Sequence, residues 1–330
     1  MDLKKAQPTQ GRKDKLQHLQ PLLALGSGVM LSSFLRNQLY APGTALRVHN
    51  RLGAALLALA LILGLPEGSV RAAPDGGGFS ETLRSIKLCN GETPPSVESQ
   101  ISACTRLIES QDSKSVITIA YNNRGNALAA KGDADDAIRS YSAAIELSPR
   151  YAKAFNNRGL AFRKKGEHAR ALQDFDEATR LDPKYAHAFA NRAATFEQLG
   201  DYQRALRDYT AAAQRQPNLF EPWSGLCWTR AIIGELREAL DDCNKALVIR
   251  PEDPPTLDSR GLVLLKMGEV DRSIQDFSTA LRFQPGLARA SYGRGLAKMQ
   301  AGDLTGGEAD IAAARYRDPM ARFLGYGVEP

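Results

Sequence analysis

The sequence predicts an all-α fold, an α-solenoid of antiparallel helix pairs stacked along the chain. Residues 118–321 repeat one pattern six times at a period of 34 residues, with no insertion or deletion. Within each copy, apolar and small residues recur at steps of three and four, the spacing of one helix face. Glycine and proline recur at fixed points where helices would end. A strict period of this length indicates one supersecondary unit built repeatedly, and such arrays usually bind partners.

The first element along the chain is a secretory signal peptide, predicted over residues 48–73. Fourteen apolar residues, Leu52–Leu65, follow Arg47 and Arg51, and small residues at Ala72 and Ala73 suit a signal peptidase. A membrane-spanning helix would need about 20 apolar residues. The repeats are therefore expected in the periplasm or outside the cell, after cleavage near Ala72 and Ala73. The alternative is an uncleaved signal anchor, which would leave the repeats tethered to a membrane.

The position of this signal predicts a later start of translation. Residues 1–47 show little periodicity, and 51 residues precede the apolar run. We expect the chain to begin at Met30 or Val48, so that residues 1–47 would be an extension that is not translated. The net charge of +6 also lies here, because residues 1–73 hold nine Lys or Arg against three Asp or Glu, and residues 74–330 hold 34 of each. The charge therefore does not indicate a nucleic-acid partner.

Residues 74–117 are predicted to be a leader followed by an N-terminal capping segment that ends in a helix, roughly 96–110. The four cysteines lie after the signal peptide at spacings of 15 and 16, which favours the local pairs Cys89–Cys104 and Cys227–Cys243. Closing a loop of this size would contribute roughly 3 kcal/mol of stability. The alternative is four buried free thiols. No metal site is expected, because the chain has no CxxC motif and residues 74–330 contain only His168 and His187.

One copy, residues 152–185, shows how each repeat is expected to fold. Phe155, Gly159 and Phe162 share one face of a first helix. Glycine at the fifteenth position ends this helix, and proline at the thirty-second cannot continue the second one. Small residues at the eighth position allow the two helices to approach closely. The six copies are 118–151, 152–185, 186–219, 220–253, 254–287 and 288–321, followed by a tail, 322–330.

This pattern resembles the tetratricopeptide repeat, over six copies of 34 residues in the 330-residue chain. The resemblance implies a right-handed superhelix whose concave surface, lined by the first helices, holds a partner. The fourth copy departs most, with Cys227, Arg230 and Cys243 at positions where the family has small, apolar and aromatic residues. The sixth copy is loose, and we expect it to serve as a cap. Its departures are Ser291, Lys298 and Gly307.

Two charged rows follow the same period. Arginine recurs at the seventh position and aspartate at the twenty-third, with Leu226 and Ser140 as the exceptions. The arginines are Arg124, Arg158, Arg192, Arg260 and Arg294, and the aspartates are Asp174, Asp208, Asp242, Asp276 and Asp310. The shared period favours an ion-pair ladder that sets the stacking register over an anion-binding groove. Whether the pairs form within or between repeats stays open at this point.

Asparagines mark the expected concave face of the first three copies. Asn123, Asn157 and Asn191 hold the sixth position, and Asn122, Asn126 and Asn156 lie beside them. An amide both donates and accepts, so such a row can hold the backbone of an extended peptide. The row is similar to the asparagine ladder of O-linked N-acetylglucosamine transferases. The alternative is amides that bond to each other along a solvated helix face. The cations of the family's carboxylate clamp are missing, so capture of chaperone tails is not expected.

Later copies are expected to offer an apolar groove at the same face. Its residues would be Trp228, Leu262, Leu265, Tyr292, Leu296 and Met299, with the alternative that several of them are core. No catalytic constellation and no cofactor motif is present. The sequence therefore predicts a non-enzymatic scaffold, of the kind exported by Gram-negative bacteria, that binds a protein or peptide segment. The asparagines, Trp228 and Tyr292 are its expected contacts. The alternative is a membrane-anchored organiser of a cell-envelope complex.

Overall fold

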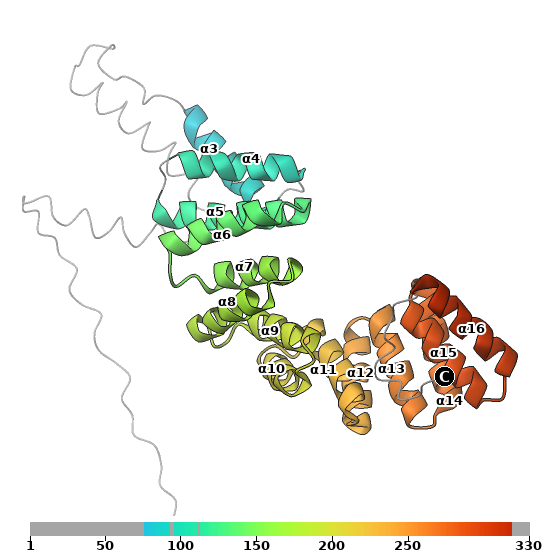
Figure 1. Cartoon of the computed structure of the whole chain (residues 1–330). Coiled ribbons are helices and arrows are strands. Elements are labelled where there is room, and N and C mark those ends of the chain that lie inside the picture. The colour runs from blue at the N-terminus through green and yellow to red at the C-terminus, as the bar shows by residue number, and fades with distance from the viewer. Residues whose placement is uncertain (1–75, 93–95, 111–112, 319–330) are drawn as a thin grey trace, which may run out of the picture. The chain divides into compact units, whose positions relative to one another are not determined.

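The computed structural model describes residues 76–92, 96–110 and 113–318, and these residues form helices and no strand (Figure 1). The predicted signal peptide, the extension over 1–47 and the tail over 322–330 lie outside the described residues. The helices are α3 (Gly76–Cys89), α4 (Val97–Glu109), α5 (Lys114–Lys131), α6 (Ala134–Leu147), α7 (Ala152–Lys164), α8 (His168–Leu181), α9 (Ala186–Gln198), α10 (Tyr202–Arg215), α11 (Phe220–Ile233), α12 (Leu236–Ile249), α13 (Pro254–Lys266), α14 (Val270–Phe283), α15 (Ala288–Gln300) and α16 (Leu304–Arg317).

The helices from α5 to α16 form six antiparallel pairs, one for each copy of the sequence repeat. A glycine at the fifteenth position ends or follows each first helix with positive φ, from 77° at Gly200 to 100° at Gly132. Only glycine adopts this backbone conformation without strain. Among the described helices, close backbone approaches join each helix only to its neighbour or to the next but one along the chain. The predicted all-α repeat solenoid is confirmed.

The two helices of a repeat approach most closely where the eighth position meets the twenty-fourth. A Cβ added to Gly159 would lie 2.8 Å from the ring of Phe175, and one added to Gly261 would lie 2.8 Å from the ring of Phe277. Both phenylalanines are fully buried. Glycine is therefore required here because the aromatic ring occupies the place of its side chain.

The third repeat solves the same packing problem differently. Ala193 replaces the glycine, and the ring of Tyr209 lies against Gly225 of the next repeat, 2.3 Å from where a Cβ would be. Gly225 holds the sixth position, where earlier copies have asparagine. Because the tyrosine ring fills that space, a side chain at residue 225 would collide with it. This contact is a physical reason for the asparagine row to stop at the fourth repeat.

The fourth repeat replaces the glycine–aromatic contact with a covalent one. Cys227 on α11 and Cys243 on α12 form a disulfide, with Cα atoms 4.7 Å apart, and both residues are fully buried. They occupy the eighth and twenty-fourth positions, as predicted. A disulfide of this kind stabilises mainly by restricting the unfolded chain.

A further helix pair, α3 and α4, precedes the first repeat and covers it. The helix predicted over 96–110 forms as α4, whose first turn is capped by the side chain of Ser96. Cys89 and Cys104 form the second predicted disulfide, with Cα atoms 4.8 Å apart. Together with Leu107, they pack against Ala120 of α5 in one buried cluster. The pair therefore closes the N-terminal end of the repeat core.

The arginine and aspartate rows form ion pairs within repeats and not between them, which answers the question that the sequence left open. Nε and Nη2 of Arg158 bond both oxygens of Asp174 at 2.9 and 2.8 Å, and Arg192 bonds Asp208 at 2.7 and 2.8 Å. The same two-bond pair joins Arg260 to Asp276 and Arg294 to Asp310. Such bidentate pairs fix the guanidinium plane as well as its position.

The same arginines also reach back to the preceding repeat. Nη1 of Arg158 donates to Ser142 at 3.0 Å, and that of Arg192 to Asp176 at 2.8 Å. Nη1 of Arg260 likewise donates to Asn244 at 2.9 Å. Each of these acceptors holds the twenty-fifth position of the repeat before. One guanidinium therefore joins its own helix pair to the previous one, which sets the stacking register.

Ser140 interrupts the aspartate row and Leu226 interrupts the arginine row, and in each case another contact within the same repeat replaces the missing ion pair. Nε of Arg124 donates to the hydroxyl of Ser140 at 3.2 Å in place of a carboxylate. In the fourth repeat, which has Leu226 at the seventh position, Arg230 takes over and bonds Asp242 at 2.7 Å. Burial raises the pKa of Asp242, and the bond from Lys245 and the charge of Arg230 counteract that rise.

Candidate partner-binding surface

The predicted asparagine row forms a relay of hydrogen bonds along α5, α7 and α9. Each bond joins the Nδ2 of one asparagine to the Oδ1 of another. The relay runs from Asn191 to Asn156 (2.9 Å), from Asn156 to Asn157 (3.1 Å), from Asn157 to Asn122 and Asn126 (3.0 Å each), from Asn122 to Asn123 (3.3 Å) and from Asn123 to Asn90 (3.0 Å). It therefore links three repeats to the end of α3.

The relay limits what these amides can offer a partner. Asn122 and Asn156 are only 4% and 3% exposed, so the structure corrects the prediction that they contact a partner directly. Asn157 donates to two acceptors and accepts from Asn156, so its amide is largely satisfied internally. The bonds among amides match the alternative given by the sequence. Asn126 is exposed, and Asn123 and Asn191 are half-buried, so these three can still be reached.

The predicted apolar groove in the later repeats is mostly core. Leu262 is fully buried and Tyr292 is 3% exposed, and both belong to the largest hydrophobic cluster of the described chain. The structure therefore corrects the prediction that Tyr292 is a surface contact. The reason is the stacking of α13 and α15, which contact each other directly. Leu265, Leu296 and Met299 are partly buried and pack against the same cluster.

Trp228 is half-buried on α11 and takes part in a charged contact that spans three repeats. The guanidinium of Arg289, on α15, lies 4.0 Å from the centre of its indole ring. Arg289 also pairs with the carboxylate of Asp258 on α13, which is fully buried. A guanidinium over an indole face is favourable because the ring face carries negative potential. The three residues, Trp228, Asp258 and Arg289, are called the tryptophan cluster below.

A second polar cluster lies on the preceding first helices, around Glu197 of α9. The hydroxyl of Tyr209 donates to its Oε2 at 3.1 Å, and that of Thr229 does so at 3.5 Å. Arg163 of α7 donates to the backbone oxygen of Asn191 at 3.1 Å, where the asparagine relay ends. Arg163, Glu197, Tyr209 and Thr229 are called the glutamate cluster below.

Burial raises the pKa of the Glu197 carboxyl. The hydrogen bond from Tyr209 opposes this rise, and so do the positive charges of Arg289 and Arg163. Arg289 of the tryptophan cluster therefore also lowers the pKa of Glu197 in the glutamate cluster. Desolvation lowers the pKa of the Arg163 guanidinium. The two clusters therefore present half-buried charges beside an indole ring. This surface can accept hydrogen bonds from a partner and contact its apolar groups.

The glutamate cluster was not predicted from the sequence, although one signal was present. Arg163 and Glu197 both hold the twelfth position of their repeats. The other copies have small or apolar residues there, namely Ala129, Ala231, Leu265 and Met299. Ionisable residues at this position in two consecutive copies indicate that these copies use it for a polar contact, whereas the other copies use it for packing. Asp258 and Arg289 carried no periodic signal, because the pair joins two different repeats.

No group of His, Cys, Asp and Glu in the described ranges is arranged to hold a metal ion. None of the helices that the structure describes has both the length and the apolar character that crossing a bilayer requires.

Two protein-family models match the sequence, and both are described as tetratricopeptide repeats. One matches residues 122–186 and 259–321, and the other matches residues 186–219. The matched ranges leave out residues 220–258, which include the repeat with the Cys227–Cys243 disulfide. No curated protein matches the sequence.

Solved structures resemble this fold at low sequence identity. A tetratricopeptide repeat protein from Parabacteroides merdae is 18% identical with a TM-score of 0.54, over 72% of this chain and 94% of that one. The Pseudomonas aeruginosa protein pilF is 17% identical with a TM-score of 0.56, over 64% and 96%. A chain of the APC/C complex Cut9–Hcn1 is 12% identical with a TM-score of 0.56, over 74% and 55%. These likenesses concern the fold alone.

Proposed function

This chain is a tetratricopeptide-repeat protein, a protein-interaction scaffold by its fold, and we propose that it acts outside the cytoplasm, in the periplasm, by holding a partner segment against its first helices. The observation that carries the binding proposal is the pair of adjoining polar clusters on α7, α9, α11, α13 and α15. Half-buried charges and an indole in one place are uncommon on a solenoid face that only needs to be solvated. Buried charges of this kind are more often found at functional sites.

The proposed contacts are the exposed parts of this surface. Asn126 and Asn191 can bond a peptide backbone through the amide groups that the relay leaves accessible. Glu197 can accept from a donor of the partner, and Trp228 can contact an apolar side chain. Aromatic residues of this kind frequently dominate the free energy of binding at protein interfaces.

The export proposal rests on two independent features. Residues 48–73 have the order of a signal peptide, with arginines, a short apolar run and small residues. The two disulfides fit an oxidising compartment, because cytosolic proteins rarely keep such bonds. Mass spectrometry of the mature N-terminus tests the proposal. A start near Ala73 is expected, whereas a chain that retains Leu52–Leu65 would instead support the membrane-anchored organiser.

The binding surface is tested by capture from periplasmic extract with matched variants. Glu197→Gln removes the charge of the glutamate cluster, and Trp228→Ala removes the indole. Glu238→Gln is the control, because it makes the same charge change at an exposed position of α12. We expect the wild type and the control to recover one common partner, and either cluster variant to recover at least tenfold less. Equal recovery by all four chains would show that the partner binds elsewhere.

A further inference from the structure

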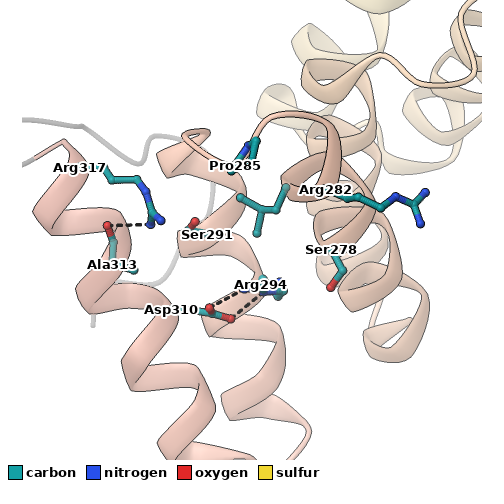
Figure 2. A pocket seen from close by; sticks show the side chains of 9 residues that line it. Ser278, Arg282, Pro285, Ser291, Arg294, Asp310, Ala313 and Arg317 are labelled. Carbon is teal, nitrogen blue, oxygen red and sulfur yellow. Dashed lines mark hydrogen bonds and ion pairs between the residues drawn. The ribbon is translucent and has the colours of Figure 1, made fainter.

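An open pocket lies away from the two polar clusters, at the junction between the fifth and sixth repeats. Its volume is about 390 Å³, and its lining comes from α14, α15, α16 and the turn after α14. Figure 2 shows Ser291 at its centre, between Pro285 and the guanidinium of Arg317. Ser291 forms the floor and is itself 3% exposed. Arg282, Arg294 and Asp310 complete the polar part of the lining.

The third repeat contains the filled counterpart of this pocket. Three periods before Ser291, Arg294 and Arg317 lie Phe189, Arg192 and Arg215. Two guanidinium groups lie near the ring of Phe189, that of Arg192 at 5.4 Å and that of Arg215 at 4.1 Å from its centre.

The arginines around the two sites are held in the same way. Arg192 bonds both oxygens of Asp208, and Arg294 bonds both oxygens of Asp310. Arg215 donates to the backbone oxygen of Ala211 at 2.7 Å, and Arg317 donates to that of Ala313 at 3.2 Å. The dashed lines of Figure 2 mark both contacts of the sixth repeat. Arg215 also donates from Nε to the backbone oxygen of Pro183 at 2.6 Å, so the sixth repeat reproduces two of the contacts that hold the arginines in the third.

The ring itself is missing from the sixth repeat. The fourth position holds a large side chain in every earlier copy: Tyr121, Phe155, Phe189, Trp223 and Leu257. The sixth copy has Ser291. The guanidiniums of Arg124 and Arg158 lie 5.1 and 5.7 Å from the rings of Tyr121 and Phe155, so the contact of the seventh position with the fourth recurs along the array. The pocket is the space that this residue fills elsewhere.

We propose that this pocket is a socket for an aromatic side chain of a protein partner, in a segment that carries carboxylates beside the aromatic residue. The ring would lie over Ser291 near Arg294 and Arg317, as Phe189 lies near Arg192 and Arg215. A planar guanidinium is attracted to an aromatic face, and two guanidiniums within reach of one ring add to this attraction. The site is separate from the first-helix surface, but it rests on the same proposed role of the chain as a protein-binding scaffold.

The charge of the pocket lining indicates which residues should flank the aromatic residue in the partner segment. The guanidiniums of Arg294 and Arg317 and the ammonium of Lys298, which bonds Asp310 at 2.9 Å, outnumber the single carboxylate of Asp310. The excess positive charge favours acidic neighbours in the partner segment. The chain's own last residues, 319–330, contain Phe323 and Tyr326 but have one arginine and one glutamate, so their charge does not match.

The test measures the binding of designed peptides to the full chain by isothermal titration calorimetry. The probe is an acetylated and amidated pentapeptide with one phenylalanine between two acidic residues on each side. We expect one probe per chain, bound at least tenfold more tightly than the same peptide with alanine at its centre. Ser291→Phe fills the socket with a ring from the chain, so it should weaken the probe at least tenfold and raise the melting temperature. Arg317→Lys, which keeps the charge but loses the planar group, should weaken the probe severalfold.

Matched variants keep the result interpretable. Phe189→Ser should open a second socket in the third repeat and change the stoichiometry from one probe to two. If this variant does not fold, Ser291→Phe still decides the matter. Equal affinity for the phenylalanine and alanine peptides, or no effect of Ser291→Phe, would overturn the proposal. So would binding that appears only in the Phe323→Ala, Tyr326→Ala double variant, because the chain's own ring would then be the occupant. Failure of the Glu197 and Trp228 variants to lose a partner would leave this site unaffected.

Discussion

At the residue scale, the contact between the eighth and twenty-fourth positions controls how closely two helices approach. Gly125 and Gly159 leave room for Tyr141 and Phe175, and a Cβ at either glycine would lie within 2.8 Å of the ring. In the third repeat Ala193 holds the eighth position, and the ring of Tyr209 packs in one cluster with Ala193 and with Leu226 of the next repeat. The ring at the twenty-fourth position can therefore contact two repeats at once.

Gly159→Ala is the direct test of this contact. The ring of Phe175 is fully buried and lies 2.8 Å from where the added Cβ would be. Overpacking of this kind costs about 1–3 kcal/mol, and the better helix propensity of alanine returns up to about 1 kcal/mol. We expect a net loss of about 1–2 kcal/mol, measured by urea unfolding. Gly286→Ala is the control, because nothing lies within 4 Å of its Cβ position. An equal loss in both variants would contradict the packing argument.

The pKa of Glu197 predicts a pH dependence at the same scale. Burial raises this pKa above its unfolded value of 4.5, so the folded chain binds the proton more tightly. The contribution of Glu197 to stability therefore falls as the pH rises from 4.5 through the raised pKa, and it stays at the lower level above it. Glu197→Gln has no such proton. The stability difference, variant minus wild type, should increase from the acidic end of this window to neutral pH in urea titrations. A difference that is constant across the window would show that the carboxyl is not perturbed.

At the element scale, the disulfide of the fourth repeat replaces an interaction that the other repeats make by packing. Cys227 and Cys243 are fully buried between α11 and α12. The same two positions are Gly159 and Phe175 in the second repeat, and Gly261 and Phe277 in the fifth. The helix pair can therefore be joined by either device. The choice of cysteine in this copy coincides with the part of the chain that the family models do not match.

A swap of the two devices tests whether they are equivalent. Cys227→Ala with Cys243→Ala removes the disulfide and should cost about 3 kcal/mol. Cys227→Gly with Cys243→Phe installs the packing of the second and fifth repeats. Full burial of a phenylalanine contributes about 1.5–3 kcal/mol, so this variant should recover roughly half of the loss. Guanidinium unfolding of the oxidised chains measures both. If the glycine–phenylalanine variant is no more stable than the double alanine, the fourth repeat has a different helix spacing and the equivalence fails.

At the scale of the whole molecule, the period determined most of the fold, and the departures from it determined the candidate sites. Glycine at the fifteenth position and the Arg–Asp rows follow local rules, so the helix pairs and their ladder could be predicted. The burial of Tyr292 could not, because it depends on how α13 and α15 stack. The Trp228–Arg289 contact joins residues of different repeats and has no period. The empty socket became visible only when the structure placed Arg317 opposite Ser291.

The stacking order also predicts that disturbances stay local. Close backbone approaches between described helices do not extend beyond the next helix but one, and the Trp228–Arg289 side-chain contact reaches from the fourth repeat only to the sixth. Stability in such an array is approximately a sum of neighbour terms. Cys89→Ser with Cys104→Ser removes the bond that holds α3 to α4 and should loosen the cap by about 3 kcal/mol, a roughly hundredfold larger open population. Hydrogen exchange should accelerate in α3, α4 and the start of α5 while α13–α16 keep their protection. Faster exchange along the whole chain would mean that the array opens as one cooperative unit, and the neighbour description would then be wrong.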